Sequence, residues 1–286
     1  MKVITLRSAV AEVLNTRRHA GFSVGFVPTM GALHEGHLSL VKRAKTENDL
    51  AVVSIFVNPI QFNNPSDLEK YPRDLNRDLD LLSPLLSDHD LVFAPTVEEM
   101  YPVADERTFA FGDMGSVMEG AFRPGHFNGV AIVVDRLFSM VGRCKGYFGE
   151  KDFQQLAIIR RLVEEELHPV EVVACETIRE SDGLAMSSRN VRIAAGLRPA
   201  AAVIYQALLR AAAEAGKRAP HEILGDITSM INQTPGFRTE YAAFADEMTL
   251  EPVTTWSDRR KVRCFIAAYA GEVRLIDNLS IPYPAG

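Results

Sequence analysis

The chain has 286 residues, of which 47% are hydrophobic and 24% are charged, a composition typical of a soluble globular protein with room for two packed domains. Its formal net charge of -6 disfavours a dedicated nucleic-acid binder, because neutralising phosphates requires a basic face. No apolar run approaches membrane-spanning length and no signal peptide is evident, so we expect a cytoplasmic protein without a membrane partner. The three cysteines form no C-x-x-C pair and are expected to be reduced residues of the core: Cys144, Cys175 and Cys264.

The first elements in the chain are predicted to be a helix and a buried strand. Apolar residues from Leu6 to Leu14 recur at helical spacing, which predicts a helix capped by Thr5 or Ser8 and ending near Gly21. The apolar run Val24–Val27 that follows indicates a short buried strand.

The connection from Pro28 to His37 combines a strand end, a glycine-bearing turn and a helix that should begin near Gly36. Backbone N–H groups at a helix N-terminus are unpaired, and the helix dipole adds partial positive charge, so such a turn can bind phosphate. His34 and His37 would both face the turn and offer donors to phosphate oxygens. On this segment alone, a plain connection is an equally good interpretation. A zinc site is disfavoured, because the pair is spaced His-x-x-His around a glycine and no third ligand is evident.

A second buried strand is predicted over Leu50–Val57, and polar side chains follow it directly. Asn58 and Gln61 come where the strand ends, and ligands of open α/β sheets bind outside the carboxyl ends of the strands. Both residues are therefore candidate contacts. The alternative is that the Asn-Pro pair marks only a turn.

The middle of the chain is predicted to alternate between helices and strands. The expected order is a helix from Tyr71–Arg73 to about Leu86, a strand over Asp90–Ala94, an unassigned stretch over Pro95–Phe111, a loop over Glu119–Gly129 and a helix over Val130–Val141. The loop holds glycine, proline, arginine and histidine together, which suits a mobile segment that closes over a site, although an ordinary exposed loop has the same composition.

Next come a strand over Lys145–Phe148, a helix over Asp152–Glu166 and a strand over Val170–Cys175. Lys151 and Gln155 are four residues apart and share a face at the helix start, where a lysine can meet a phosphate. A surface lysine is the commoner alternative.

A polar segment, Ser181–Asn190, precedes a change in composition. Its two hydroxyls beside an arginine suit a flexible phosphate clamp, and Ser187 or Ser188 equally suits a helix N-cap. The elements expected after it are helices over Ala194–Ala215 and His221–Ile231 and strands over Thr239–Phe244, Val262–Tyr269 and Val273–Ile276. We place a domain boundary near Thr177, which puts the clamp segment at the domain junction.

Six motifs occur in order between positions 28 and 190: Met30–His37 with its His-x-Gly-His core, Phe56–Phe62, Tyr71–Arg73, Arg123–Val130, Gly149–Leu156 and Met186–Arg189. The first and the last resemble the paired signatures of the nucleotidyltransferase superfamily that includes class I aminoacyl-tRNA synthetases. The whole set resembles the pantothenate synthetase (pantoate–β-alanine ligase) family. The C-terminal part matches that family in length and character but offers no comparably sharp motif.

The resemblance implies an α/β fold, with a Rossmann-type parallel-sheet domain over residues 1–176 that binds nucleotide and pantoate, and a smaller α+β lid domain over residues 177–286. It implies a cytoplasmic homodimer whose partners are the small molecules ATP, pantoate and β-alanine, with Mg²⁺ accompanying ATP and no nucleic acid. The implied reaction forms pantoyl adenylate and pyrophosphate, after which β-alanine displaces AMP to give pantothenate.

The resemblance also implies roles for individual residues. His37 would be the proton donor, with His34, Lys151 and Arg189 as the other catalytic groups. Gln61 and Gln155 would hold pantoate, and Gln61 would also border the β-alanine site. Magnesium ligands are not fixed by these motifs. The implied ATP-binding residues are Met30, Gly31, Ala32, Leu33, His34, Glu35, Gly36, His37, Gly149, Glu150, Lys151, Asp152, Ile178 through its backbone, Met186, Ser187, Ser188 and Arg189.

Two positions depart from the family pattern: Asn63 stands where glycine is usual, and Asp74 stands where threonine is common. Both affect the expected loop conformation more than the activity. The closest alternative is a related nucleotidyltransferase that acts on another carboxylate or phosphate acceptor. A non-catalytic nucleotide-binding regulator is a further alternative, but it should have lost the proton donor or the clamp, whereas His37, Lys151 and Arg189 are present.

Overall fold

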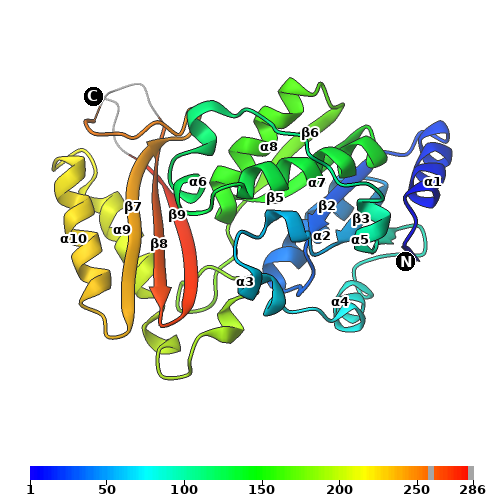
Figure 1. Ribbon diagram of the computed structural model, residues 1–286. Coiled ribbons are helices and arrows are strands. Elements are labelled where there is room, and N and C mark those ends of the chain that lie inside the picture. Colours follow the sequence, from blue (N-terminus) through cyan, green and yellow to red (C-terminus); the bar gives the residue numbers. More distant parts are fainter. Residues whose placement is uncertain (257–260, 283–286) are drawn as a thin grey trace. The chain divides into compact units, whose positions relative to one another are not determined.

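The computed structural model describes residues 1–256 and 261–282, and the chain divides into two compact units (Figure 1). The first unit comprises Met1–Phe111, Gly120–Glu150 and Ile158–Glu176. The second comprises Gly112–Glu119, Lys151–Ala157 and Thr177–Gly286. Two short segments from the middle of the chain therefore group with its C-terminal part.

The first unit is built on a six-stranded sheet whose neighbouring strands are all parallel, in the order β1-β4-β3-β2-β5-β6. The strands are β1 Lys2–Ile4, β2 Val24–Thr29, β3 Leu50–Ile55, β4 Leu91–Phe93, β5 Cys144–Gly149 and β6 Val170–Cys175. The helices of this unit are α1 Arg7–His19, α2 Glu35–Glu47, η1 Pro59–Gln61, α3 Pro65–Glu69, α4 Leu75–Leu82, α5 Val97–Met100 and α7 His126–Val141. Residues of both units make up α6 Glu119–Phe122, η3 Glu150–Asp152 and α8 Phe153–Glu165.

Helices cover both faces of this sheet, which explains why its central strands are largely apolar and almost fully buried. Successive side chains of a strand point to opposite faces. Val27 of β2 packs in one cluster with Leu38 and Val41 of α2. The neighbouring Phe26 points the other way, and its ring centroid lies 6.3 Å from that of Phe138 on α7.

The direction of chain progression reverses between β2 and β5. From β2 the chain moves outward through β3 and β4, and then returns to place β5 on the other side of β2. Parallel α/β sheets bind ligands outside the carboxyl ends of their strands at such a switch point. The segments that follow β2, β3 and β5 are therefore the ones that the topology brings to the expected binding edge.

The second unit is an antiparallel sheet of three strands with helices on one face (Figure 1). Alternate residues of the central strand, among them Val262, Cys264 and Ile266, form one core cluster with the apolar stripes of the two long helices. The strands are β7 Phe237–Asp246, β8 Val262–Ala270 and β9 Val273–Ile281. The helices are η2 Gly112–Gly115, η4 Asn190–Arg192, η5 Arg198–Ala200, α9 Val203–Glu214 and α10 Pro220–Asn232.

The predicted α/β fold class is confirmed, with a parallel sheet of Rossmann type and a smaller α+β part. The cysteines are free and buried, as expected. No helix within residues 1–256 and 261–282 is both long and apolar enough to span a membrane.

Several local predictions were wrong. Strand β1 and helices α3 and α5 were missed, because their segments are too short for a periodic pattern to emerge. No side chain caps α1, whose N-cap is Leu6 rather than Thr5 or Ser8. The alanine-rich helix α9 begins only at Val203.

The expected loop over Glu119–Gly129 is largely helical. It contains α6 and the first turn of α7, with Glu119 and His126 buried. The carboxylate of Glu119 accepts hydrogen bonds from Arg274 and from the hydroxyl of Tyr241, at 2.6 and 2.8 Å. The glycines and the proline of this segment therefore mark helix ends rather than a long loop.

We predict that Asp90 links pH to the stability of the sheet. Its buried carboxylate accepts hydrogen bonds from Ala51 N at 2.8 Å, Ser87 N at 2.7 Å and Lys45 Nζ at 3.1 Å. Burial opposes the charge, but these bonds outweigh it and hold the pKa of Asp90 below its ordinary value. The charged form therefore stabilises the fold above the ordinary carboxyl pKa of about 4, and that stabilisation is lost as the pH falls through the lower folded-state pKa.

Asp90→Asn should lower the free energy of unfolding at pH 7 by about 1–3 kcal/mol, since an amide cannot accept from all of these donors. The difference in the free energy of unfolding between Asp90→Asn and the wild type should become smaller in denaturant titrations below pH 4. The control is Asp88→Asn, whose carboxylate is fully exposed. If Asp90→Asn lowered the free energy of unfolding equally at pH 7 and at pH 3.5, Asp90 would not link pH to stability in this way.

Candidate active site

The turn after β2 is tightly folded by hydrogen bonds within the first unit. The hydroxyl of Thr29 donates to Ser54 O at 2.8 Å and accepts from Gly31 N at 3.1 Å. Gly31 and Ala32 both have positive φ, at 75° and 49°. A Cβ atom at Gly31 would lie 2.8 Å from Asp78 Oδ2, so only glycine fits this position.

Asp78 of α4 fixes the next part of this turn. Its carboxylate, in a residue only 1% exposed, accepts hydrogen bonds from Ala32 N at 2.9 Å and Leu33 N at 2.7 Å. Burial raises the pKa of Asp78 even though these two amide bonds favour its charge. Nothing in the local sequence pattern marked this aspartate, because it comes from a helix more than forty residues further along the chain.

Five backbone amides of the turn and of the helix start are bonded within the chain. The bonded N–H groups are those of Gly31, Ala32, Leu33, Gly36 and His37. The expectation of unpaired amides at these positions, ready for a phosphate, was wrong. At these five positions the N–H group is already paired within the chain.

His34 and His37 lie side by side at the start of α2. His34 is the N-cap, and its Nδ1 accepts from Gly36 N at 3.1 Å. The centroids of the two imidazole rings are 4.1 Å apart, and both residues are half-buried. The two histidines thus lie together at the turn, as expected, and their contact with phosphate stays a prediction.

Asn58 and Gln61, which follow β3, are buried and join the same turn. Gln61 Nε2 donates to Met30 Sδ at 2.9 Å, and Asn58 Nδ2 donates to Gln61 Oε1 at 3.2 Å. The ring of His126 contacts Gln61 O at 2.9 Å, so the first turn of α7 also supports this segment. The Asn58 side chain is part of a buried polar network within the chain, and its predicted contact with a ligand stays a prediction.

The segment after β5 forms η3, which contains Glu150, Lys151 and Asp152. Within the second unit, Lys151 Nζ lies 3.6 Å from Asp152 Oδ1, and Lys151 O accepts from Asn278 Nδ2 of β9 at 2.8 Å. Gln155 on the first turn of α8 is half-buried. Its neighbour Gln154 is buried, and its amide bonds three backbone groups in residues 114–119.

The segment from Ile178 to Arg189 is held within the second unit by backbone and side-chain bonds. Met186 N donates to Ile178 O at 2.9 Å, and Arg189 N donates to Ser187 Oγ at 3.3 Å. Arg179 nearby forms two bonds to Asp277, the shorter of 2.6 Å. Neither serine is the N-cap of a helix, because the short η4 that follows is preceded by Arg189.

A family model described as pantoate-beta-alanine ligase matches residues 2–280. The chain belongs to the pantoate–β-alanine ligase family. The predicted membership and the predicted enzyme class, a ligase, are thereby confirmed.

Relatives in this family match almost from end to end. The pantothenate synthetase of Bacteroides thetaiotaomicron is 49% identical over 280 residues, which cover 98% of each chain. A crystal structure of pantothenate synthetase from Thermus thermophilus has a TM-score of 0.90 and 45% identity, and covers 99% of this chain and 100% of that one. The pantoate-beta-alanine ligase of Francisella tularensis, crystallised with beta-gamma ATP and beta-alanine, has a TM-score of 0.80 and 34% identity, and covers 100% of both chains.

In this member of the family, no group of three or more His, Cys, Asp or Glu side chains within residues 1–256 and 261–282 is arranged to hold a metal ion. The individual ligand contacts predicted from the sequence remain predictions.

We predict that a side chain at Gly31 destabilises the fold more than a side chain at Gly21 does. Both have positive φ, so alanine costs each about 1–2 kcal/mol. At Gly31, an added Cβ atom would lie close to Asp78 and Ile55. At Gly21, an added Cβ atom would have no other atom within 4 Å. Denaturant unfolding should therefore show Gly31→Ala to be less stable than Gly21→Ala by at least about 1 kcal/mol. Equal losses would mean that the close packing of this turn is not as described.

Proposed function

We propose that the chain condenses pantoate with β-alanine to pantothenate at the expense of ATP, through a pantoyl adenylate, with release of AMP and pyrophosphate. The observation that carries this proposal is the polar cluster at the carboxyl ends of β2 and β3, where the paired rings of His34 and His37 share a turn with the Met30–Gln61 contact. It lies in a chain whose end-to-end relatives are pantothenate synthetases.

The first step is the attack of a pantoate carboxylate oxygen on the α-phosphorus of ATP. A carbon-bound oxygen joins phosphorus, the bond from the α-phosphorus to the bridging oxygen breaks, and pyrophosphate leaves with the electron pair. No strong base is needed, because the carboxylate is already ionised near neutral pH. Catalysis then depends on positioning and on stabilising the charge that moves onto the leaving phosphates.

Donor side chains would supply that stabilisation. We assign His37 as the proton donor toward the phosphate oxygens and His34 as a second donor of the same turn. Lys151 and Arg189 would meet the β- and γ-phosphates as fixed positive charges, and the hydroxyls of Ser187 and Ser188 would add hydrogen bonds. The amides of Ala32, Leu33 and Gly36 are bonded within the chain, which supports assigning the contacts with the phosphates to these side-chain donors.

Gln61 and Gln155 are proposed to hold pantoate. A neutral amide can orient hydroxyl and carboxylate groups without adding a charge that competes for the phosphates. Gln61 is well suited to this role, because it is buried at the end of β3 and its side chain is held by Asn58. We also place Gln61 at the border of the β-alanine site.

In the second step, the free amine of β-alanine attacks the acyl carbon of the adenylate. A carbon–nitrogen bond forms, the bond from that carbon to the AMP oxygen breaks, AMP leaves with the electron pair, and the nitrogen releases its extra proton to water. We propose that Mg²⁺ enters with ATP, held by phosphates and water. A cytoplasmic homodimer and a lid function of the C-terminal domain, which would shield the adenylate from water, are part of the same proposal.

The direct experiment is to measure pyrophosphate, AMP and pantothenate with ATP, magnesium and pantoate, with and without β-alanine. We expect pyrophosphate release that requires pantoate, and pantothenate with equimolar AMP once β-alanine is added. Absence of release with pantoate would contradict the proposal. Release with another carboxylate or a phosphomonoester instead would favour a related nucleotidyltransferase.

We predict that His37→Ala slows pyrophosphate release by about 100-fold or more, since a positioned proton donor contributes at least that much. His37 is half-buried, so circular dichroism should show an intact fold. The control is His19→Ala, which removes an exposed histidine of α1 in the same unit. Unchanged turnover in His37→Ala would remove its assigned role.

Gln155→Ala should raise the KM for pantoate at least about tenfold while the KM for ATP changes little, because one amide bond to substrate is lost. Gln154→Ala is the matched control. Its amide bonds only backbone groups of the second unit, so it should lower stability without this selective effect. A selective loss of ATP affinity in Gln155→Ala would show that the pantoate pocket is wrongly assigned.

A further inference from the structure

We propose that Tyr101 is a positioning residue for pantoate, which acts through Asn58 to fix the orientation of the Gln61 amide. This inference rests on the proposed function, because it takes Gln61 as a pantoate contact.

The orientation of the Asn58 amide follows from its buried partners. Gly129 O, a carbonyl that can only accept, lies 3.0 Å from Asn58 Nδ2, so the amide nitrogen must point that way. The hydroxyl of Tyr101 donates to Asn58 Oδ1 at 2.8 Å. Because Asn58 is only 1% exposed, water is not a ready substitute for this donor.

Asn58 in turn determines which end of the Gln61 amide is offered to a ligand. Asn58 Nδ2 donates to Gln61 Oε1 at 3.2 Å, so the carbonyl end of Gln61 is engaged. The amide nitrogen of Gln61 points to the turn after β2, where it meets the weak acceptor Met30 Sδ. Gln61 therefore presents N–H groups, which suit a carboxylate or hydroxyl oxygen of pantoate and do not suit an ammonium group.

The aromatic ring of Tyr101 is held in place by α7. The guanidinium of Arg136 lies 5.1 Å from the ring centroid, and Arg136 Nη1 donates to Met100 O at 2.9 Å. The ring of Phe56 packs near it, at a centroid distance of 6.1 Å. Burial raises the pKa of Tyr101, so its hydroxyl keeps the proton that it donates.

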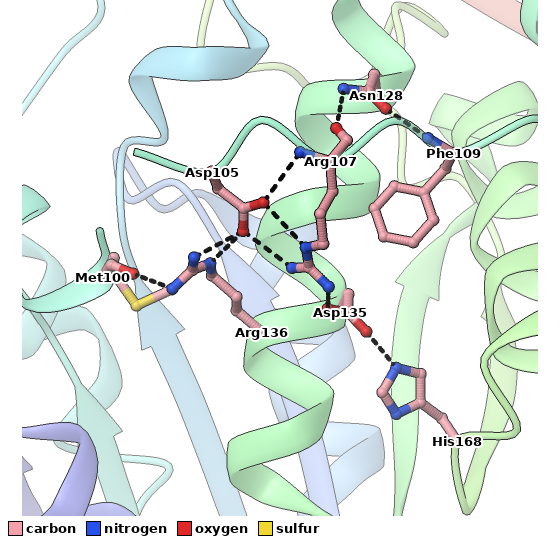
Figure 2. Close-up of polar contacts among 8 residues, drawn as sticks. All are labelled: Met100, Asp105, Arg107, Phe109, Asn128, Asp135, Arg136 and His168. Carbon is pink, nitrogen blue, oxygen red and sulfur yellow. Dashed lines mark hydrogen bonds and ion pairs between the residues drawn. The ribbon is translucent and has the colours of Figure 1, made fainter. Parts of the chain in front are cut away.

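Arg136 belongs to a group of polar residues that fixes the segment around residues 100–109 on α7 (Figure 2). We call it the α7 ion cluster; its members are Asp105, Arg107, Asp135, Arg136 and His168. Asp105 bonds Arg136 Nε at 2.8 Å and Arg107 Nε at 2.9 Å, and Arg107 Nη1 reaches Asp135 at 2.7 Å. Hydrogen bonding by Arg107 keeps the pKa of Asp105 well below its ordinary value, so this carboxylate remains charged at neutral pH.

Helix α7 therefore supports both ends of the series of hydrogen bonds that runs from Tyr101 through Asn58 to Gln61. Asp135 and Arg136 of α7 hold the segment that carries Tyr101, and Gly129 and His126 of α7 contact Asn58 and Gln61. The close approach requires glycine at 129, where a Cβ atom would lie 2.5 Å from Ile60 O. Of the residues that hold Tyr101, Asn58 and Gln61 together, we propose that only Gln61 contacts pantoate.

The test compares the kinetics of Tyr101→Phe with those of the wild type. The variant keeps the ring and loses only the hydroxyl, so we expect an intact fold, a KM for pantoate about tenfold higher, and a KM for ATP within about twofold of the wild-type value. The matched control is Tyr147→Phe, which removes a hydroxyl that bonds Glu47 and Asn48 from a buried tyrosine of the same unit. An unchanged KM for pantoate in Tyr101→Phe, or an equal rise in Tyr147→Phe, would overturn the inference.

A double-mutant cycle tests the part played by the α7 ion cluster. Arg136→Met should also raise the KM for pantoate. The double variant Arg136→Met/Tyr101→Phe should have nearly the same KM for pantoate as Tyr101→Phe alone, since both substitutions act through the hydrogen bond from Tyr101 to Asn58. If the two substitutions raised the KM for pantoate by factors that multiply in the double variant, they would act independently, which would contradict this role of Arg136. If the wild-type protein turned over no pantoate, the proposed function itself would be overturned. If the wild type turned over pantoate normally and Tyr101→Phe had an unchanged KM for pantoate, only the positioning role of Tyr101 would be overturned.

Discussion

Buried polar groups at the carboxyl edge of the parallel sheet must find partners within the chain, and this constraint shapes the candidate site. Asp78 accepts from two amides of the turn after β2, Thr29 bridges that turn to β3, and Asn58 joins the end of β3 to α7. Leaving such groups unpaired would cost free energy at each one. The turn and the segment after β3 are therefore held rigidly before any ligand arrives.

This internal pairing changes how the site can work. The amides that are bonded to Asp78 or to the His34 ring are already paired within the chain, so we assign charge stabilisation to side chains in the proposed function. The two adjacent imidazoles and the oriented amide of Gln61 are the groups that the first unit offers. Preorganised donors of this kind are effective in catalysis because they need not reorganise as charge develops.

The sequence was sufficient to predict the fold class, the central strands and the long helices, because these carry strong periodic or continuous apolar patterns. The buried strands β2, β3 and β6 and the apolar stripe of α7 are examples. The motifs also indicated that the residues after β2 and β3 would form one site, and the Met30–Gln61 contact agrees with that expectation.

Other features depend on contacts between distant segments and have no local signature. Asp78 reads as one more acidic residue of an exposed helix, and Tyr101 lies in a stretch that no pattern could assign. The helical state of Glu119–Phe122 was hidden by neighbouring glycines and by the proline that follows, while the hydrogen-bond partners of Glu119 come from more than a hundred residues away. Tertiary partners, rather than intrinsic propensity, determine the conformation at these places.

Activation of pantoate as an acyl adenylate, which we propose above, can be followed through the fate of the carboxylate oxygens. Pantoate labelled with oxygen-18 in its carboxylate would be supplied with ATP, magnesium and β-alanine, and the products would be analysed by mass spectrometry. We expect one labelled oxygen of each pantoate consumed to appear in AMP, because the bond to phosphorus is retained when the acyl carbon is attacked. Unlabelled AMP, or label in inorganic phosphate together with ADP, would contradict it.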